Sequence, residues 1–491
     1  MLRSDRAGKL RSHDRGPRVA RGSGRRAARH LHGDPPVGLF GPKGTPLDEL
    51  RAPRPVGGSA GAPGLNCLVL GAGGREYAIA WALARAGSVA TIGVVPGNAG
   101  TLLFARAPEI DPKDVPALER HIAASHIDLA IVGPDELVAD GLGDSLRRCG
   151  IAVVAPSRDA ARIEWSKAYA KELMEEAGVP TAAWHTYPSA AEARAALERG
   201  DGAVVVKADG LAAGKGVVVA RDRAQALDAL GSPTISTGMV VLEDVLEGQE
   251  VSLQALVDGE TVIALPPARD HKRVGDGDTG PNTGGMGAVS PAPALPDDEA
   301  QDAADALIAP VAHALVGRGT PFRGVIFAGL IRTRDGWRVL EYNARFGDPE
   351  AEVTLPRLEG DFGELMLALG EGRLAAHVAE SPVRFSPLAV IDVVLCADGY
   401  PGAPRRGDPI EGTDRLPEGV YAMHGATRRI DAGGPPADGR AALDAGLVTA
   451  GGRVMHIVGT GDTIAEARAR AYEGAERVTF AGKFYRSDIG G

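Results

Sequence analysis

The sequence predicts a multidomain protein that combines α/β and α+β domains. Its 491 residues are too many for a single hydrophobic core, and this length suggests about three domains. Residues 65–165 alternate short apolar strands with helices, a pattern typical of a doubly wound sheet. The chain from Leu388 onwards consists mainly of short strands and turns, which predicts a small β-rich C-terminal domain.

Composition and charge exclude several classes of protein. The formal net charge is −10, and residues 1–64 hold a net +8, which leaves −18 for the remainder. A body this acidic does not predict a nucleic-acid partner. No apolar run approaches the roughly 20 residues that cross a membrane, so we expect no membrane partner. Cys67, Cys149 and Cys396 are scattered along the chain, which favours a reducing interior such as the cytoplasm.

Residues 1–64 form a basic extension rich in Arg, Gly and Pro. The segment has few apolar side chains and no sustained period, so it cannot bury enough surface to fold, and we expect disorder. It is interpreted as a dispensable extension or the product of a start codon placed too far upstream. A targeting segment and a nucleic-acid-binding arm stay open as alternatives.

A strand, a glycine-rich turn and a helix open the next domain. The strand is Cys67–Leu70 and the turn is Gly71–Glu76. Free N–H groups and the positive end of the helix dipole face such a turn, so it can bind an anion. A dinucleotide site would need an acid near the end of the second strand, Ile92–Val95, and the sequence has none there. We therefore assign the turn to a phosphorylated sugar and predict a Rossmann-like substrate-binding domain over residues 65–165.

A second polar segment, Asp270–Gly287, is rich in charged residues and glycine. It lacks the apolar side chains of a buried helix or strand, so we predict a long ordered loop without secondary structure, and such loops are usually functional. Lys272 and Arg273 could neutralise phosphate oxygens, whereas Asp276 and Asp278 could bind an amine or a metal. A solvated charged loop without a function is the alternative.

This segment reads DHKRVGDGDTGPNTGGMG, and a second segment, Asn343–Glu350, reads NARFGDPE. Together they resemble the two signatures of the phosphoribosylamine–glycine ligase (glycinamide ribonucleotide synthetase) family, which belongs to the ATP-grasp superfamily. The resemblance runs from about Asn66 to Ile489. It implies an ATP-grasp unit at residues 166–387, with a mobile lid at about 181–248, and a C-terminal domain at residues 388–491.

The resemblance also implies the ligands. ATP and Mg²⁺, or Mn²⁺, would be the cofactors, and glycine and 5-phosphoribosylamine would be the substrates of a monomeric cytoplasmic enzyme of purine biosynthesis. The glycine carboxylate would take the γ-phosphate of ATP, and the ribosyl amine would then displace phosphate from glycyl phosphate. This chain departs from the family at Tyr77, where the family usually has His, and at Glu352, where it usually has Gln.

Two strands around a glycine-rich loop predict the nucleotide site. Lys207 ends the first strand and Lys215 lies in the loop, but the loop lacks the G-x-x-x-x-G-K-[ST] pattern of a P-loop. A hairpin loop that closes over a triphosphate would exclude water from a reactive intermediate. The resemblance implies that Lys167, Lys207 and Lys215 bind the phosphates of the nucleotide. It also implies that Glu243 and Leu246 belong to the hinge that receives adenine, and that Glu250 accepts hydrogen bonds from the ribose.

Strand period predicts a metal site. A predicted hairpin around Asp335–Gly336 places Glu341 and Asn343 on one face of its second strand, with Leu340 and Tyr342 on the other. A carboxylate and an amide oxygen side by side suit Mg²⁺, which takes few protein ligands. The alternative is an exposed polar strand face without a ligand.

The remaining site residues follow from the resemblance. It implies catalytic roles for Arg345, Asp278 and Lys215, glycine binding by Asp278 and Asp348, and phosphoribosyl binding by Gly73, Gly74, Arg75 and Glu76. Three other functions stay open: another ATP-grasp carboxylate–amine ligase or carboxylase, a nucleotide-binding regulatory protein that has lost catalysis, and an oxidoreductase.

Overall fold

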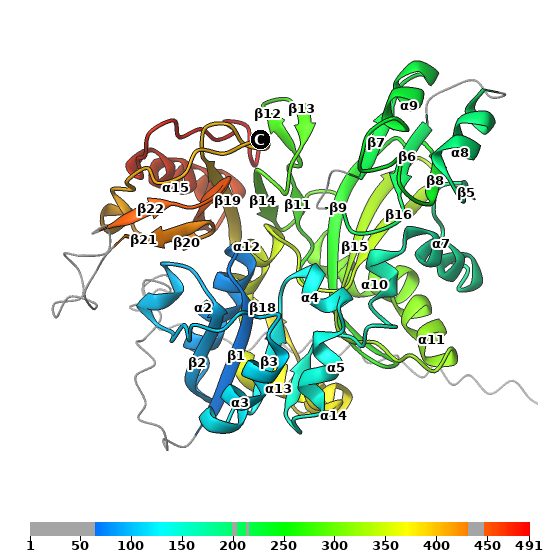
Figure 1. The fold of residues 1–491 in the computed structure, drawn as a ribbon. Coiled ribbons are helices and arrows are strands. Elements are labelled where there is room, and N and C mark those ends of the chain that lie inside the picture. The colour runs from blue at the N-terminus through cyan, green and yellow to red at the C-terminus, as the bar shows by residue number, and fades with distance from the viewer. Residues whose placement is uncertain (1–63, 199–203, 213–215, 431–445) are drawn as a thin grey trace, which may run out of the picture. The chain divides into compact units, whose positions relative to one another are not determined.

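The computed structural model describes residues 64–198, 204–212, 216–430 and 446–491 (Figure 1). Within these ranges, four larger sheets and the helices that pack on them position the functional residues. None of the helices described there is both long enough and apolar enough to traverse a lipid bilayer.

The first sheet is parallel, as the alternating pattern predicts. Its order is β2-β1-β3-β4, and its strands are β1 (Leu65–Gly71), β2 (Val89–Pro96), β3 (Leu129–Val132) and β4 (Ala152–Val154). Runs of Val, Ile, Leu and Ala bury most of these strands, because a parallel sheet is covered on both faces.

Helix α2 (Gly74–Arg85) follows β1 directly. It is buried from Gly74 to Ala84 and not only along one face, because it also packs against α12 (Glu350–Thr354) and β20 (Val420–His424). The other helices of this domain are α3 (Val115–Ser125), α4 (Asp135–Ala139), α5 (Leu142–Arg147) and α6 (Arg162–Trp165).

A separate antiparallel sheet lies within residues 184–244. Its order is β5-β8-β6-β7, and its strands are β5 (Trp184–Tyr187), β6 (Val204–Ala208), β7 (Val217–Ala220) and β8 (Val240–Asp244). Helices α8 (Ala190–Leu197) and α9 (Arg223–Ala229) begin at side-chain caps, Ser189 and Asp222, and share an apolar core with the sheet. The predicted pair of strands around the glycine-rich loop is β6 and β7.

The central sheet contains the predicted hairpin. Its order is β10-β9-β15-β16, and its strands are β9 (Gln249–Asp258), β10 (Thr261–Ala264), β15 (Arg323–Thr333) and β16 (Gly336–Asn343). A bulge leaves Leu340 as an extra residue on β16, between the partners of Gly329 and Leu330, so the strict alternation of faces is interrupted there. Helices α7 (Lys167–Glu176), α10 (Ala300–Leu307) and α11 (Ala309–Gly317) belong to this part of the chain.

The last large sheet combines distant segments. Its order is β11-β14-β19-β23-β20, and the strands besides β20 are β11 (Arg269–Asp270), β14 (Gly287–Ser290), β19 (Ala389–Cys396) and β23 (Arg453–Gly461). Helix α15 (Ile464–Arg477) packs on β19 and β23 (Figure 1). The polar segment that begins near Arg269 therefore contributes two strands to the sheet of the C-terminal region.

The prediction that Asp270–Gly287 lacks secondary structure is wrong. Between β11 and β14 the chain forms an antiparallel ribbon of β12 (Arg273–Gly275) and β13 (Thr279–Asn282). Its turn places Gly277 at φ 65° and Asp278 at φ 54°, a left-handed conformation that Gly and Asp tolerate in tight hairpins. A two-stranded ribbon can leave both faces in solvent, so its formation needs no apolar alternation.

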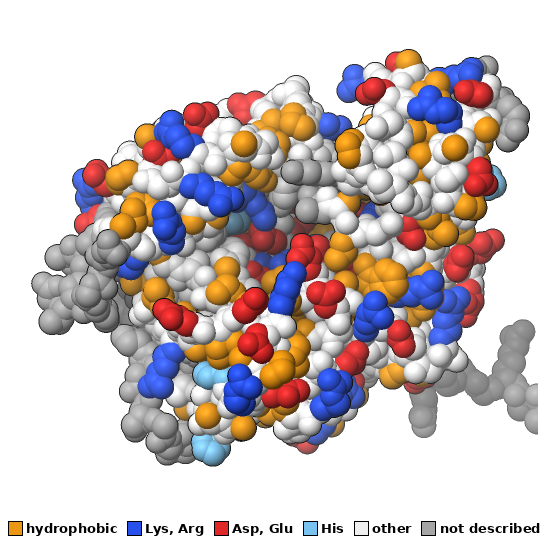
Figure 2. Space-filling model, in the orientation of Figure 1, with side chains coloured by type: hydrophobic (Ala, Val, Ile, Leu, Met, Phe, Trp, Pro, Cys, Tyr) orange, Lys and Arg blue, Asp and Glu red, His pale blue; other side chains and the backbone are white. Residues whose placement is uncertain are grey.

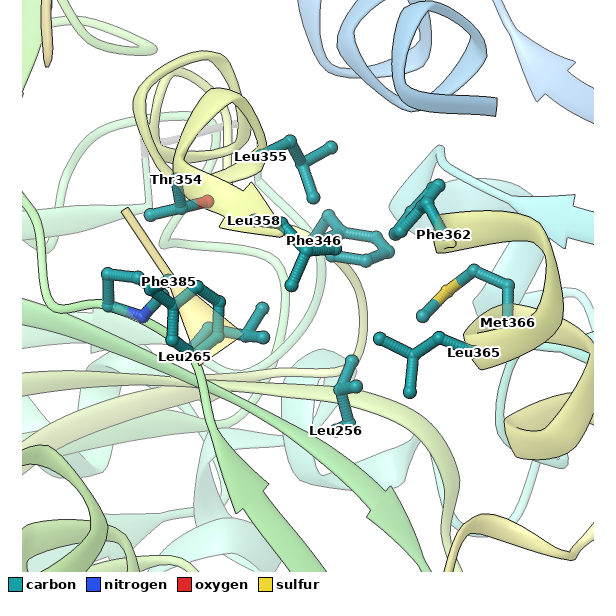
Figure 3. A pocket seen from close by; sticks show the side chains of 11 residues that line it. Leu256, Leu265, Phe346, Thr354, Leu355, Leu358, Phe362, Leu365, Met366 and Phe385 are labelled. Atoms are coloured by element: carbon teal, nitrogen blue, oxygen red, sulfur yellow. The ribbon is translucent and has the colours of Figure 1, made fainter. Parts of the chain in front are cut away.

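An apolar cluster joins the central sheet to α13 (Phe362–Glu371). Leu256 of β9 and Phe346 lie among Phe362, Leu365 and Met366 of this helix (Figure 3). The gap between these side chains has no room for water, so it is a packing feature and not a ligand site. The remaining elements here are α14 (Leu374–Glu380), β17 (Leu358–Glu359) and β18 (Arg384–Phe385), and the C-terminal region adds β21 (Thr427–Arg429) and β22 (Leu447–Thr449).

The side chain of Asp361 stabilises the start of α13. Its carboxylate caps α13 by accepting from the Glu364 N–H at 3.0 Å, and it accepts from the N–H and hydroxyl of Ser88 at 2.9 and 2.6 Å. Replacing Asp361 with Ala should lower the melting temperature by about 1–2 °C, measured by calorimetry, because a cap is worth about 1 kcal/mol and the chain is long. The Asp361→Asn variant keeps an acceptor oxygen and should lose less. Equal melting temperatures for Asp361→Ala and the unaltered chain would contradict the capping role.

Candidate active site

Charged side chains surround a cleft of about 890 Å³. Figure 2 shows acidic and basic side chains together in a recess near the middle of the molecule. The predicted site residues that line the cleft are Arg75, Lys167, Lys207, Glu243, Leu246, Glu250, Asp278, Glu341, Asn343, Arg345 and Asp348. Gly73, Gly74 and Glu76 are described but are not lining residues, and Lys215 lies outside the described residues.

The predicted metal pair lies at the end of β16. Glu341 and Asn343 both line the cleft. Leu340 and Tyr342, which strand period predicts on the other face, are lining residues as well, although the hydroxyl of Tyr342 donates to the Leu307 carbonyl. The amide nitrogen of Asn343 donates to the Tyr342 carbonyl at 2.8 Å, which fixes the side-chain amide. Desolvation would raise the pKa of Glu341, but nearby cations, Lys272 first among them, outweigh it and lower that pKa. An ionised carboxylate beside an amide fits Mg²⁺.

Arg345 follows the metal pair and retains a free donor. One of its terminal nitrogens lies 3.1 Å from a carboxylate oxygen of Glu164, and the other Glu164 oxygen accepts from the Ala344 N–H at 2.8 Å. The buried Nε of Arg345 has no acceptor among the described residues. Because a buried unpaired donor is costly, this nitrogen is suited to an anionic ligand in the cleft.

Lys167 and Lys207 of the cleft donate to backbone carbonyls, and Lys207 shares a carboxylate with Lys171. Lys167 donates to the Gly210 carbonyl at 2.9 Å, and Lys207 donates to the Leu340 carbonyl at 3.0 Å. Glu243 forms ion pairs with Lys207 at 2.7 Å and with Lys171 at 2.8 Å. Since the Glu243 carboxylate is engaged by two lysines, the predicted adenine hinge can offer backbone groups but not this side chain.

Lys171 is a residue of the cleft that the sequence reasoning missed. It lies four residues after Lys167 on α7, and residues four apart share one face of a helix. That spacing is the signal available in the sequence, because the family resemblance assigns Lys167, on the same helix face, to the nucleotide.

The carboxylate of Glu76 accepts hydrogen bonds from the glycine-rich turn in which it lies. One oxygen accepts from the Gly73 N–H at 2.7 Å, and the other accepts from Arg75 Nε at 2.6 Å. This is the capping geometry of a residue three positions inside a helix. The Gly73 N–H is therefore already paired. Of the four predicted residues in this turn, Arg75 is the one that lines the cleft, and phosphoribosyl binding here stays a prediction.

Arg453 on β23 joins the two signature segments and was also missed. Its guanidinium donates to the Gly284 carbonyl at 2.6 Å and forms an ion pair with Asp348 at 2.8 Å. Desolvation would raise the pKa of Asp348, but Arg453, His456 and Arg75 outweigh it and lower that pKa. The carboxylate at the end of the second signature is thereby kept ionised.

A buried group lies behind Asp348. The Nδ1 atom of His456 is hydrogen-bonded to Asp392 at 2.7 Å, and Glu352 is fully buried with no hydrogen-bond partner for either oxygen among the described residues. Burial, with Asp348 and Asp392, raises the pKa of Glu352 well above its usual range. Burial therefore favours the neutral form of Glu352, and the neutral form resembles the Gln that the family usually has there.

Tyr77, the other departure, is an interior packing residue. Its ring stacks on His424 at a centroid distance of 5.7 Å and meets Phe104 edge-on at 5.4 Å. The side chain is 5% exposed and does not line the cleft. The imidazole expected from the resemblance would accordingly face packed side chains at this position.

Asp278 lies in the turn of the β12–β13 ribbon. One of its oxygens accepts from Arg486 at 2.7 Å, and the Arg486 side chain is 2% exposed whereas that of Asp278 is 56% exposed. The ion pair fixes the turn against the end of the chain. Asp278 still lines the cleft, so the structure holds it between Arg486 and the ligand space.

Comparison with known proteins shows which family this arrangement belongs to. Profiles of phosphoribosylglycinamide synthetase match the chain in order, with the N domain at residues 65–164, the ATP-grasp (A) domain at 165–351 and the C domain at 390–491. A phosphoribosylamine–glycine ligase of Mycobacterium leprae is 44% identical over 434 residues, which cover 87% of this chain and 98% of that protein. The chain belongs to the phosphoribosylglycinamide synthetase family. The resemblance inferred from the two signatures is thus confirmed.

Solved structures agree with the fold of a phosphoribosylglycinamide synthetase. The crystal structure of phosphoribosylamine–glycine ligase from Thermotoga maritima is similar with a TM-score of 0.71 at 33% identity, covering 86% of this chain and 100% of that one. The biotin carboxylase domain of 2-oxoglutarate carboxylase from Hydrogenobacter thermophilus shares the fold at 16% identity, with a TM-score of 0.62 over 85% of this chain and 91% of that one. The predicted fold class is confirmed.

The predicted metal pair, Glu341 and Asn343, can be tested by its effect on the rate of ATP-dependent turnover. Replacing Glu341 with Ala should reduce ATP-dependent turnover by roughly 100-fold or more, because the carboxylate that would hold the cation is removed. The Glu299→Ala variant, which removes an exposed glutamate outside the cleft, should keep the original rate. Steady-state rates and melting curves of both variants provide the check. A correctly folded Glu341→Ala variant with an unaltered rate would refute the metal assignment.

Proposed function

We propose that this protein ligates glycine to 5-phosphoribosylamine with conversion of ATP to ADP and phosphate, giving glycinamide ribonucleotide in purine biosynthesis. The proposal is supported by the name of the M. leprae relative, which aligns over 87% of the chain. The observation that carries it is the cleft, because both signature segments line it together with Lys167 and Lys207. We further propose that the enzyme acts as a monomer in the cytoplasm.

The chemistry explains why the cleft combines cations with carboxylates. A carboxylate is a poor acyl donor, because its leaving group would be oxide. An oxygen of the glycine carboxylate attacks the γ-phosphorus, the bond to ADP breaks, and glycyl phosphate forms. The amine of phosphoribosylamine then attacks the glycyl carbonyl, loses a proton and expels phosphate. The protein's contribution is positioning and charge neutralisation.

Phosphates are assigned to the basic residues of the cleft. Lys167, Lys207 and Lys215 would hold the triphosphate, and Arg345 would stabilise the transferring phosphoryl group with its unpaired Nε. Glu341 and Asn343 would hold Mg²⁺ or Mn²⁺, which when bound would neutralise phosphate charge. The biotin carboxylase domain from H. thermophilus, which shares the fold, was crystallised in complex with MgADP, which supports this choice of nucleotide and metal.

The remaining roles of the cleft concern the base, the ribose and the two other substrates. Adenine would meet the backbone of the hinge at Glu243 to Leu246, and Glu250 would accept from the ribose hydroxyls. Asp278 and Asp348 would bind the glycine ammonium. The phosphoribosyl group would lie near Gly73 and Gly74 and be held chiefly by Arg75, because Glu76 is committed to its own turn.

Phosphate release from ATP tests the proposed reaction. Sustained release should require glycine and phosphoribosylamine together, because glycyl phosphate turns over only when the amine attacks it. Glycine alone should give at most one phosphate per enzyme molecule. Sustained release with bicarbonate in place of glycine would identify a carboxylase, and nucleotide binding without any turnover would identify a regulatory protein. Either result would overturn the proposal.

A further inference from the structure

A buried glutamate in the nucleotide region is held between two lysines. Glu243 of β8 forms an ion pair with Lys207 of β6 at 2.7 Å through one oxygen and with Lys171 of α7 at 2.8 Å through the other. The three side chains are between 2% and 7% exposed, and all three residues line the cleft. No role for Lys171 follows from the signatures or from the reaction as proposed.

Each lysine is also tied to the backbone of β16. Lys207 donates to the Leu340 carbonyl at 3.0 Å. Lys171 donates to the Thr181 hydroxyl at 2.6 Å, and that hydroxyl donates to the Val339 carbonyl at 2.6 Å. The group therefore connects the start of the predicted lid, at Thr181, with the strand that carries the metal pair.

The charges of this group do not cancel. Two lysines face one glutamate, and desolvation, followed by the charge of Lys207, lowers the pKa of Lys171 to about 8, although Glu243 and Glu341 oppose the shift. A buried cation without a full counter-charge is unfavourable. An anionic ligand in the cleft would restore the balance and stabilise the protonated form of Lys171.

We propose that Lys171 is a positioning residue for the nucleotide: by sharing Glu243, it leaves the charge of Lys207 available for the phosphates of ATP. Without Lys171, Glu243 would pair with Lys207 alone and neutralise it. Binding of the anionic nucleotide completes the counter-charge of the lysine pair, so it draws a proton onto Lys171. This inference rests on the proposed use of ATP. It assigns Lys171 a role in nucleotide binding and couples that binding to protonation of the Lys171 amine.

A structural anchor for the lid is the competing role, and proton uptake separates the two. A residue that only braces Thr181 against β16 would leave nucleotide binding independent of its own protonation. A positioning residue makes binding weaken above about pH 8, because the amine then loses its proton, and makes binding near that pH consume protons from the buffer.

Calorimetric titration of the full-length chain with MgADP at pH 8, in two buffers of different ionisation enthalpy, tests the proposal. The unaltered chain should take up about half a proton per nucleotide, because a group with a pKa near the solution pH is half protonated before binding. Lys171→Met should take up none and bind about tenfold more weakly, the effect expected on losing a charged partner in a buried site. Lys171→Arg should keep the affinity without proton uptake and without weakening above pH 8.

Lys113→Met is the matched control, because Lys113 is an exposed lysine, 61% accessible, outside the cleft. It should behave as the unaltered chain does. Unchanged affinity in folded Lys171→Met, or MgADP binding to the unaltered chain without proton uptake, would overturn the positioning role. The second measurement needs no variant, so its negative outcome overturns the proposal even if the substitutions prevent folding. Failure of the unaltered chain to bind MgADP at all would instead count against the proposed function.

Discussion

The compensation of buried charge is the constraint on which the cleft depends. Desolvation would lower the pKa of Lys272, but acids around it, with Glu250 and Glu341 first, outweigh that effect and raise it. The same pairing keeps Glu341 ionised and, through Arg453, keeps Asp348 ionised. Lys272, Glu341 and Asp348 are thus kept charged by neighbours from other segments, and this part of the site exists only when those segments are brought together.

Strand β16 is the element that brings them together. Its carbonyls at Val339 and Leu340 receive the Thr181 hydroxyl and the Lys207 ammonium, and its side chains at Glu341 and Asn343 face the cleft. The bulge at Leu340 interrupts the ladder just before the metal pair, and bulges near active sites re-aim side chains. One strand therefore supports the nucleotide lysines and presents the predicted metal ligands.

Local sequence patterns predicted those parts of the structure that depend on local physics. The parallel strands after Leu65, the hairpin around Asp335 and the shared face of Glu341 and Asn343 follow from apolar runs and strand period. Arg453 and Gly284 are in contact although they lie 169 residues apart in the sequence. Hydrophobic periodicity describes local structure, so it cannot predict such a contact. At the turn before α2 the sequence cannot separate capping from anion binding, because both use the same residues at a helix start. The β12–β13 ribbon was missed because polar ribbons carry no apolar alternation.

We propose that ATP and Mg²⁺ bind between the cleft lysines and the end of β16. A crystal structure of the full-length chain with Mg²⁺ and a non-hydrolysable ATP analogue tests this most directly. We expect the triphosphate beside Lys167 and Lys207, with the cation on Glu341 and Asn343. A triphosphate bound instead at the turn before α2, away from β16, would contradict it.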